Sequence, residues 1–278
     1  MRASRQIFLL CFCLFWSSPA KAQENTTPSD FDAALKLYQM GDYDEAARVG
    51  AVDKTADGLA LAAQATLVIA RYYAEPDEQI GLIEHALELT EYALNLDPDH
   101  VAAHIHRAIA LGFRGRIEGS SRDARDSKKL IDHALTLAPE NSWVWAALGG
   151  WHGEVVRKAG SFFGSIIFGA KFKKGKQAFA QAMELAPDSI AIRTAYVRML
   201  LKVRPRREHG EIIAQLDLVT TMEPEDAFDI FMIRLADAMM QAIKKNDKDR
   251  LGFLLEDQQP LGLLLDHDPE SNGEIDSE

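Results

Sequence analysis

The residues whose spacing best suits chemistry are three histidines, His100, His104 and His106. Residues four apart lie on one helical face and imidazole is a common zinc ligand, so His100 and His104 suggest a metal site. Only Asp97 and Asp99 offer further ligands beside them. Because His100 stands where a helix is expected to begin and His106 points away from His104, we expect surface and groove histidines and no bound metal.

The sequence lacks the short motifs that mark common active sites. It has no Gly-x-Ser-x-Gly elbow, no His-Glu-x-x-His pair and no phosphate-binding glycine loop. Its two cysteines, Cys11 and Cys13, lie in a segment that we expect to be removed. Acid pairs such as Asp42 with Glu45 are typical of solvated turns. We therefore predict a protein that is not an enzyme and that needs no cofactor.

The first 22 residues resemble a secretory signal peptide. Arg2 and Arg5 precede an apolar run over residues 7–16, and a small-x-small ending follows at Ala20 and Ala22. The apolar run is short for a membrane span, and the cysteines lie inside it rather than at a lipidation site. We expect cleavage after Ala22 and a short flexible segment over residues 23–29. An uncleaved N-terminal anchor is the alternative.

The net charge of the chain limits the classes of partner that it can bind. Loss of residues 1–22 removes three basic residues and no acidic residue, which takes the formal net charge from −11 to −14. Such a negative chain is a poor candidate for nucleic-acid binding. The remaining chain has no cysteine, so packing rather than disulfides must stabilise it. We expect it in the periplasm of a Gram-negative bacterium.

Four segments of the chain end alike, which indicates an internal repeat. They end in proline at Pro98, Pro139, Pro187 and, more loosely, Pro224, and the separations are 41, 48 and 37 residues. In each of the first three, an alanine stands five residues before the proline. A small residue there lets a second helix approach its neighbour, and proline ends the helix. The pattern predicts stacked pairs of helices.

The repeat resembles the tetratricopeptide motif, whose period is about 34 residues. Trp145, Leu148 and Gly149 reproduce its Trp-x-x-Leu-Gly opening, and Phe179 and Ala182 stand where it wants an aromatic and a small residue. The resemblance covers about Asp30 to Arg250. It implies an all-α solenoid of stacked antiparallel helix pairs over residues 30–257, with about five units and marginal end repeats at 31–49 and 227–250.

The middle units are similar to a narrower family, the regulators of microtubule dynamics. The segments that carry this resemblance are Arg114–Gly119, Lys128–Leu135 and Trp145–His152. The family carries no known chemistry, so the resemblance implies an interaction module. We do not extend the microtubule connection to a chain that is predicted to be exported.

In tetratricopeptide stacks the first helix of each pair lines a concave groove that holds peptides. The register of the resemblance implies that six residues line this groove and contact a protein or peptide partner: Ile105, Ile109, Trp143, Ala146, Thr194 and Arg198. Trp143 is the strongest anchor candidate because aromatic side chains dominate the energetics of interfaces. An ordinary core tryptophan is the equal alternative.

An insertion over residues 157–176 is the most distinctive local feature, since it carries basic and apolar residues in an otherwise acidic chain. Its candidate contact residues are Arg157, Lys158, Phe162, Phe163, Ile166, Ile167, Phe168, Lys171, Lys173 and Lys174. Apolar residues flanked by cations suit an anionic membrane surface, or equally an acidic protein. The alternative is a helical extension whose aromatic residues pack onto the solenoid while its lysines are solvated.

The C-terminal segment 258–278 is acidic after an apolar stretch at residues 261–265. We expect it to be disordered, with Leu263 to Leu265 docking on the last helices or acting as a short motif. Taken together, the sequence predicts an exported, non-catalytic scaffold for protein interactions in the cell envelope. The alternative is a membrane-surface protein attached through residues 157–176.

Overall fold

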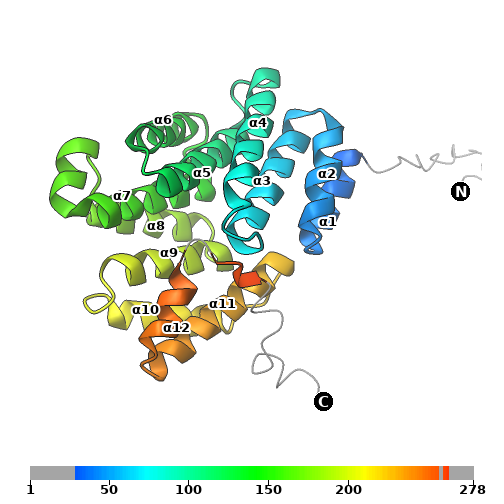
Figure 1. Cartoon of the computed structure of the whole chain (residues 1–278). Helices are drawn as coiled ribbons and strands as arrows, with labels where there is room; N and C mark the ends of the chain where they lie inside the picture. The colour runs from blue at the N-terminus through cyan, green and yellow to red at the C-terminus, as the bar shows by residue number, and fades with distance from the viewer. Residues whose placement is uncertain (1–28, 257–258, 263–278) are drawn as a thin grey trace, which may run out of the picture.

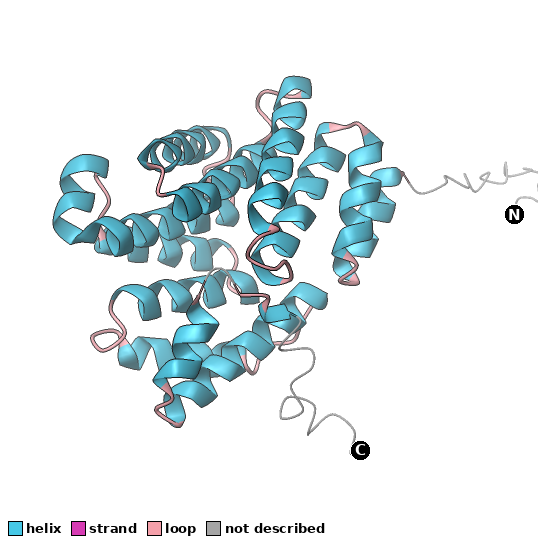
Figure 2. Cartoon of the chain, in the orientation of Figure 1, coloured by secondary structure: helices cyan, strands magenta, loops and turns pink. Residues whose placement is uncertain are grey.

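The part of the chain that the structure describes is helical throughout. The structure is a computed structural model, and it describes residues 29–256 and 259–262. The predicted signal peptide and residues 263–278 of the predicted tail lie outside this part. Within it there are twelve helices and no strand (Figure 2). None of these helices combines the length and the apolar character that a membrane span requires.

The bounds of the helices are α1 Asp30–Gln39, α2 Tyr43–Asp53, α3 Ala56–Tyr72, α4 Gln79–Leu96, α5 Val101–Glu118, α6 Ser121–Leu137, α7 Ser142–Phe168, α8 Phe172–Leu185, α9 Ile190–Val203, α10 His209–Val219, α11 Ala227–Lys244 and α12 Lys248–Leu255. Consecutive helices pack as pairs, and each odd-numbered helix also packs against the next odd-numbered helix (Figure 1). This arrangement confirms the predicted all-α solenoid of helix pairs. It contains six pairs, because the end segments expected to be marginal each form a complete pair.

The repeated endings found in the sequence lie where helices end. α4, α6 and α8 stop two residues before Pro98, Pro139 and Pro187. The alanines five residues before these prolines, Ala93, Ala134 and Ala182, are completely buried, as small residues at a close helix contact should be. The backbone N–H of the residue before each proline donates back to that alanine's carbonyl oxygen. The prediction of helix pairs that end in this way is confirmed.

Helices α7 and α8 approach each other closely at Gly149. A Cβ atom added to Gly149 would lie 2.5 Å from the ring of Phe179, which is almost completely buried. One turn further along α7, a Cβ atom on Gly153 would collide with the side chain of Met199 on α9. Glycine at these positions therefore lets α7 lie tightly against two neighbours at once.

The solenoid curves until its two ends meet. α11 contacts α1, and the ring centroid of Tyr72 at the end of α3 lies 4.9 Å from that of Phe231. After α12 the chain returns to α3, where Leu261 is completely buried and Gly262 lies against the ring of Tyr73. The C-terminal helices therefore close the curve on the N-terminal ones (Figure 1).

Candidate functional site

The six residues predicted to line a groove do not form one exposed surface. Ile105, Ala146, Thr194 and Arg198 are buried, with exposed fractions of 8% or less. Ile109 is half-buried against the core. Trp143 differs from them, since 46% of its surface is exposed at the start of α7.

Helix α12 explains why the face of α9 is covered. The Arg198 side chain donates a hydrogen bond from Nη1 to the carbonyl oxygen of Leu254, at 3.0 Å. Leu254 is completely buried, and α12 packs against α9. The protein's own C-terminal helix therefore covers the part of α9 where the sequence predicted a partner contact at Arg198.

The predicted insertion, residues 157–176, comprises the C-terminal part of α7, the turn that follows it and the first residues of α8. Gly160 interrupts α7 with φ 75° and ψ 162°, a conformation that is essentially restricted to glycine. After this kink, residues 161–168 form a short helix that ends at Gly169, which has φ 68°. We call residues 160–169 the tip segment. Two glycines in conformations that other residues avoid therefore set its start and its end.

The tip segment folds back on α7 and turns its large apolar residues outward. Gly164 is buried, and a Cβ atom there would lie 3.6 Å from Val155 and 3.7 Å from Val156. The backbone N–H of Ala170 donates to the carbonyl oxygen of Gly164 at 2.9 Å. Small residues thus make the contact with α7. The outer side carries Phe162, Phe163, Ile166 and Ile167, which are 69%, 60%, 67% and 57% exposed.

The expectation that the aromatic residues of the insertion pack onto the solenoid is wrong for Phe162 and Phe163. Their rings contact each other, with centroids 5.4 Å apart, and both remain exposed. It holds for Phe168, which is half-buried against the core with the Arg125 guanidinium 5.9 Å from its ring centroid, and for Phe172, which is buried in the core. The kink at Gly160 produces this difference because it reverses the direction of the chain.

The basic residues of the insertion divide into paired and free cations. Arg157 pairs with Glu154, and Lys176, which ends the insertion, reaches Glu208 at 2.7 Å and also Glu211. Four exposed lysines of the insertion have no acidic partner among the residues that the structure describes: Lys158, Lys171, Lys173 and Lys174. These four cations flank the tip segment on both sides in the sequence.

Two of the three histidines considered for a metal, His100 and His104, have separate structural partners. His100 caps α5 by accepting from the Ala103 backbone N–H, and its Nε2 lies 2.9 Å from Asp57 Oδ1. His104 Nε2 lies 2.8 Å from the carbonyl oxygen of Pro98, and burial lowers the pKa of its ring. Among residues 29–256 and 259–262, no group of three His, Cys, Asp or Glu residues lies in an arrangement that could hold a metal ion.

His152, on α7, is a buried histidine without full hydrogen bonding. It is 4% exposed, and its Nδ1 atom has no hydrogen-bond partner in the described structure. Burial, together with the nearby charges of Lys128 and Lys174, lowers the pKa of His152 to about 4. The ring is therefore neutral in the folded protein at pH 5, where an unfolded histidine is mostly charged.

This buried ring predicts that the protein loses stability in acid. His152 binds a proton below about pH 6.5 in the unfolded chain but only near pH 4 in the folded chain. The contribution of the neutral ring to the free energy of unfolding is therefore fully present above pH 6.5 and is lost as the pH falls toward 4. Chemical denaturation measures the free energy of unfolding of wild type and of His152→Gln at each pH. Between pH 7.5 and 4.5 wild type should lose about 2.5 kcal/mol more than His152→Gln. His85→Gln, at an exposed ring, is the control and should keep the wild-type slope.

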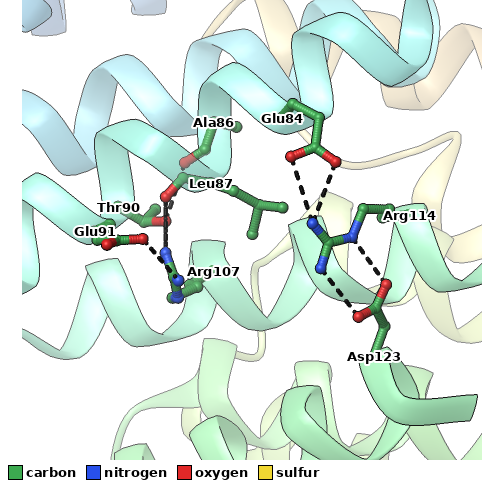
Figure 3. A network of polar contacts seen from close by, with 8 residues as sticks. All are labelled: Glu84, Ala86, Leu87, Thr90, Glu91, Arg107, Arg114 and Asp123. Carbon is green, nitrogen blue, oxygen red and sulfur yellow. Dashed lines mark hydrogen bonds and ion pairs between the residues drawn. The ribbon is translucent and has the colours of Figure 1, made fainter. Parts of the chain in front are cut away.

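Two arginines on one face of α5 join three helices (Figure 3). Arg114 makes a bidentate contact with Asp123 on α6, at 2.9 and 3.0 Å, and reaches Glu84 on α4 at 3.2 Å. Seven residues earlier on α5, Arg107 donates to the carbonyl oxygen of Leu87 at 2.7 Å and contacts Glu91 at 3.2 Å. The hydrogen bond with Asp123 contributes most to raising the pKa of Arg114.

A hollow of about 630 Å³ lies over this network, between α5 and α6. Its cations are already paired: Arg122 and Lys129 both contact Asp126, and Arg114 is held as described. The hollow therefore presents little free charge to a ligand. We interpret the network as a clamp between neighbouring helix pairs. The sequence offered one signal for it, the seven-residue spacing of Arg107 and Arg114.

Residues 33–194 match the family described as regulator of microtubule dynamics protein 1-3, over more than half of the chain. The chain belongs to this family. No curated protein matches the chain.

The family region begins within α1 and ends within α9. It therefore includes the arginine clamp and the tip segment, and it excludes α10, α11 and α12, which close the curve. The resemblance to this family that the sequence indicated is confirmed. Assignment of the helix pairs to the tetratricopeptide class stays a prediction.

Proposed function

We propose that this chain is an exported, non-catalytic adaptor of the cell envelope that binds a partner through its tip segment. One observation carries the proposal. Four large apolar side chains, Phe162, Phe163, Ile166 and Ile167, are exposed together on an ordered, glycine-bounded turn. Exposed apolar clusters of this kind on soluble domains mark interaction sites. The helical family region is consistent with an interaction module.

The surface around Trp143 is a second candidate for the binding site. Trp143 is 46% exposed, and a large aromatic side chain at a surface suits an interface anchor. The residues that would accompany it, such as Ala146 and Thr194, are buried, so it offers less accessible surface than the tip segment. We therefore favour the tip segment and keep Trp143 as a comparison in the test.

Affinity capture from an envelope extract with crosslinking tests the proposed function. We expect Phe162→Ser/Ile166→Ser to lose the partners that wild type captures. Tyr92→Ser/Leu96→Ser removes a matched exposed pair from α4, where the residues are 62% and 58% exposed, and should capture the same partners as wild type. If only Trp143→Ala loses the captured partners, the binding site lies around Trp143. Capture that no variant changes would contradict both sites.

Export is proposed from the composition of residues 1–22. A basic start, a short apolar run and small residues at the end are typical of a secretory signal. N-terminal sequencing of the protein recovered from the periplasm should begin at Gln23. Recovery only from the cytoplasm, with Met1 or Arg2 first, would contradict export.

The absence of catalysis is proposed from the lack of recognisable catalytic motifs in the sequence. The family name refers to microtubules, and we do not extend that role to a chain proposed to be exported. Turnover of any substrate by the purified protein, lost on substitution of a defined residue, would contradict a purely binding role.

A further inference from the structure

We infer that the tip segment is an anchor for an anionic membrane surface, into whose interface Phe162, Phe163, Ile166 and Ile167 insert. The inference rests on the proposed function, in which the tip segment is the binding surface, and it names the partner as lipid. Three features of the described residues support it: the direction in which the apolar side chains point, the position of the cations, and the place of the segment in the molecule.

The tip segment presents its apolar side on a projection. Gly164 faces α7 while the two phenylalanines and the two isoleucines face outward. The segment lies at the far end of α7, at the edge of the solenoid (Figure 1). A projecting turn can reach into the boundary between headgroups and acyl chains without displacing the rest of the protein. Transfer of phenylalanine and isoleucine side chains from water into this apolar environment is favourable.

The free cations flank the tip segment in the sequence. Lys158 precedes the kink by two residues, and Lys171, Lys173 and Lys174 follow the tip at the start of α8. None of the four has an acidic partner among the described residues, whereas Arg157 and Lys176 are both paired. Unpaired lysines beside exposed apolar residues are the arrangement by which protein segments bind anionic lipid.

The three lysines at the start of α8 are not explained by the stability of that helix. The N-terminus of a helix carries a partial positive charge, so basic residues there are unfavourable. Lys171 is the N-cap residue, and its side chain makes no capping hydrogen bond. In a chain with a net charge of −11, this local excess of positive charge suits an external anionic surface better than an internal role.

Vesicle co-sedimentation tests the inference. Residues 1–22 carry their own apolar run, so the test uses the chain 23–278, which retains every helix that the structure describes. We expect it to pellet with vesicles of phosphatidylcholine containing 40 mol% phosphatidylglycerol and to remain in solution with phosphatidylcholine alone. Binding should fall at least tenfold when sodium chloride is raised from 50 to 500 mM, because salt screens the lysines.

Two sets of variants separate the apolar and the charged contributions. Phe162→Ser/Ile166→Ser should weaken binding at least tenfold. Lys171→Gln/Lys173→Gln/Lys174→Gln should weaken it roughly 100-fold at 50 mM salt, since each lysine near an anionic surface contributes about fivefold. The matched controls are Tyr92→Ser/Leu96→Ser and Lys36→Gln/Lys244→Gln/Lys248→Gln, which change exposed residues elsewhere and should bind like wild type. Circular dichroism verifies that each variant is folded.

The outcomes distinguish this inference from the proposed function. Vesicle binding that depends on the tip residues and the three lysines supports the inference. If wild type fails to pellet, or if the tip variants bind like wild type, the lipid inference is overturned. Tip-dependent capture of a protein in the crosslinking experiment would then leave the proposed function in place with an acidic protein as the partner. If Phe162→Ser/Ile166→Ser keeps both vesicle binding and protein capture, the lipid inference and the proposed function are both overturned.

Discussion

Arg114→Met is expected to lower the free energy of unfolding by about 3–5 kcal/mol, because it removes the guanidinium that makes a bidentate contact with Asp123. The Asp123 side chain is 8% exposed, so its buried carboxylate would lose this counter-charge. The same change releases Glu84 on α4, and the contact between two neighbouring helix pairs weakens. Chemical denaturation followed by circular dichroism measures the loss.

Two further variants make this test specific. Arg122→Met removes an exposed cation of α6 that contacts Asp126 at 3.6 Å, and it should cost less than about 0.5 kcal/mol. Arg114→Met/Asp123→Leu removes both partners of the buried pair, and its cost should be clearly less than the sum of the single changes. A cost for Arg114→Met no larger than that for Arg122→Met would show that the network is not a clamp.

Phe179→Ala is expected to destabilise the protein by about 3–5 kcal/mol, because its ring fills the contact between α7 and α8. Gly149→Ala should cost about 1–3 kcal/mol for the opposite reason, since its new methyl group would lie 2.5 Å from that ring. In Gly149→Ala/Phe179→Ala the methyl group enters space that the ring has left. The double variant should therefore lose less than the sum of the two losses.

Gly150→Ala provides the matched control for this second prediction. It lies one residue further along α7, and a Cβ atom there has no neighbour within 4 Å. Replacing glycine by alanine within a helix at an open position should leave stability unchanged or raise it by up to about 1 kcal/mol. Equal effects of Gly149→Ala and Gly150→Ala would contradict a tight contact at Gly149.

The helix pairs were predictable because their signals are local. An alanine five residues before a proline specifies both the close contact and the end of a helix, and this holds at Ala93, Ala134 and Ala182. The position of the insertion was also predictable, since it appears as extra length between Pro139 and Pro187. Neither the helix ends nor the position of the insertion depends on how distant parts of the chain pack.

The direction of the tip residues was not predictable in the same way. The composition of residues 157–176 allows Phe162 and Phe163 to pack inward or to face solvent. The outcome depends on the backbone conformation of Gly160 and on the contact of Gly164 with Val155. A glycine in a sequence shows that a rare conformation is permitted, but only the packed structure shows that it is used.

What the sequence by itself determined is the class of fold, the ends of the central helices and the place of the insertion, because each follows from spacings of a few residues. What only the tertiary structure decided is which surfaces remain accessible. Arg198 is covered by Leu254, 56 residues later, and Arg71 contacts the carbonyl oxygen of Glu256, 185 residues later. The curvature of the whole stack brings these residues together, and it arises from the sum of many helix contacts rather than from any local pattern.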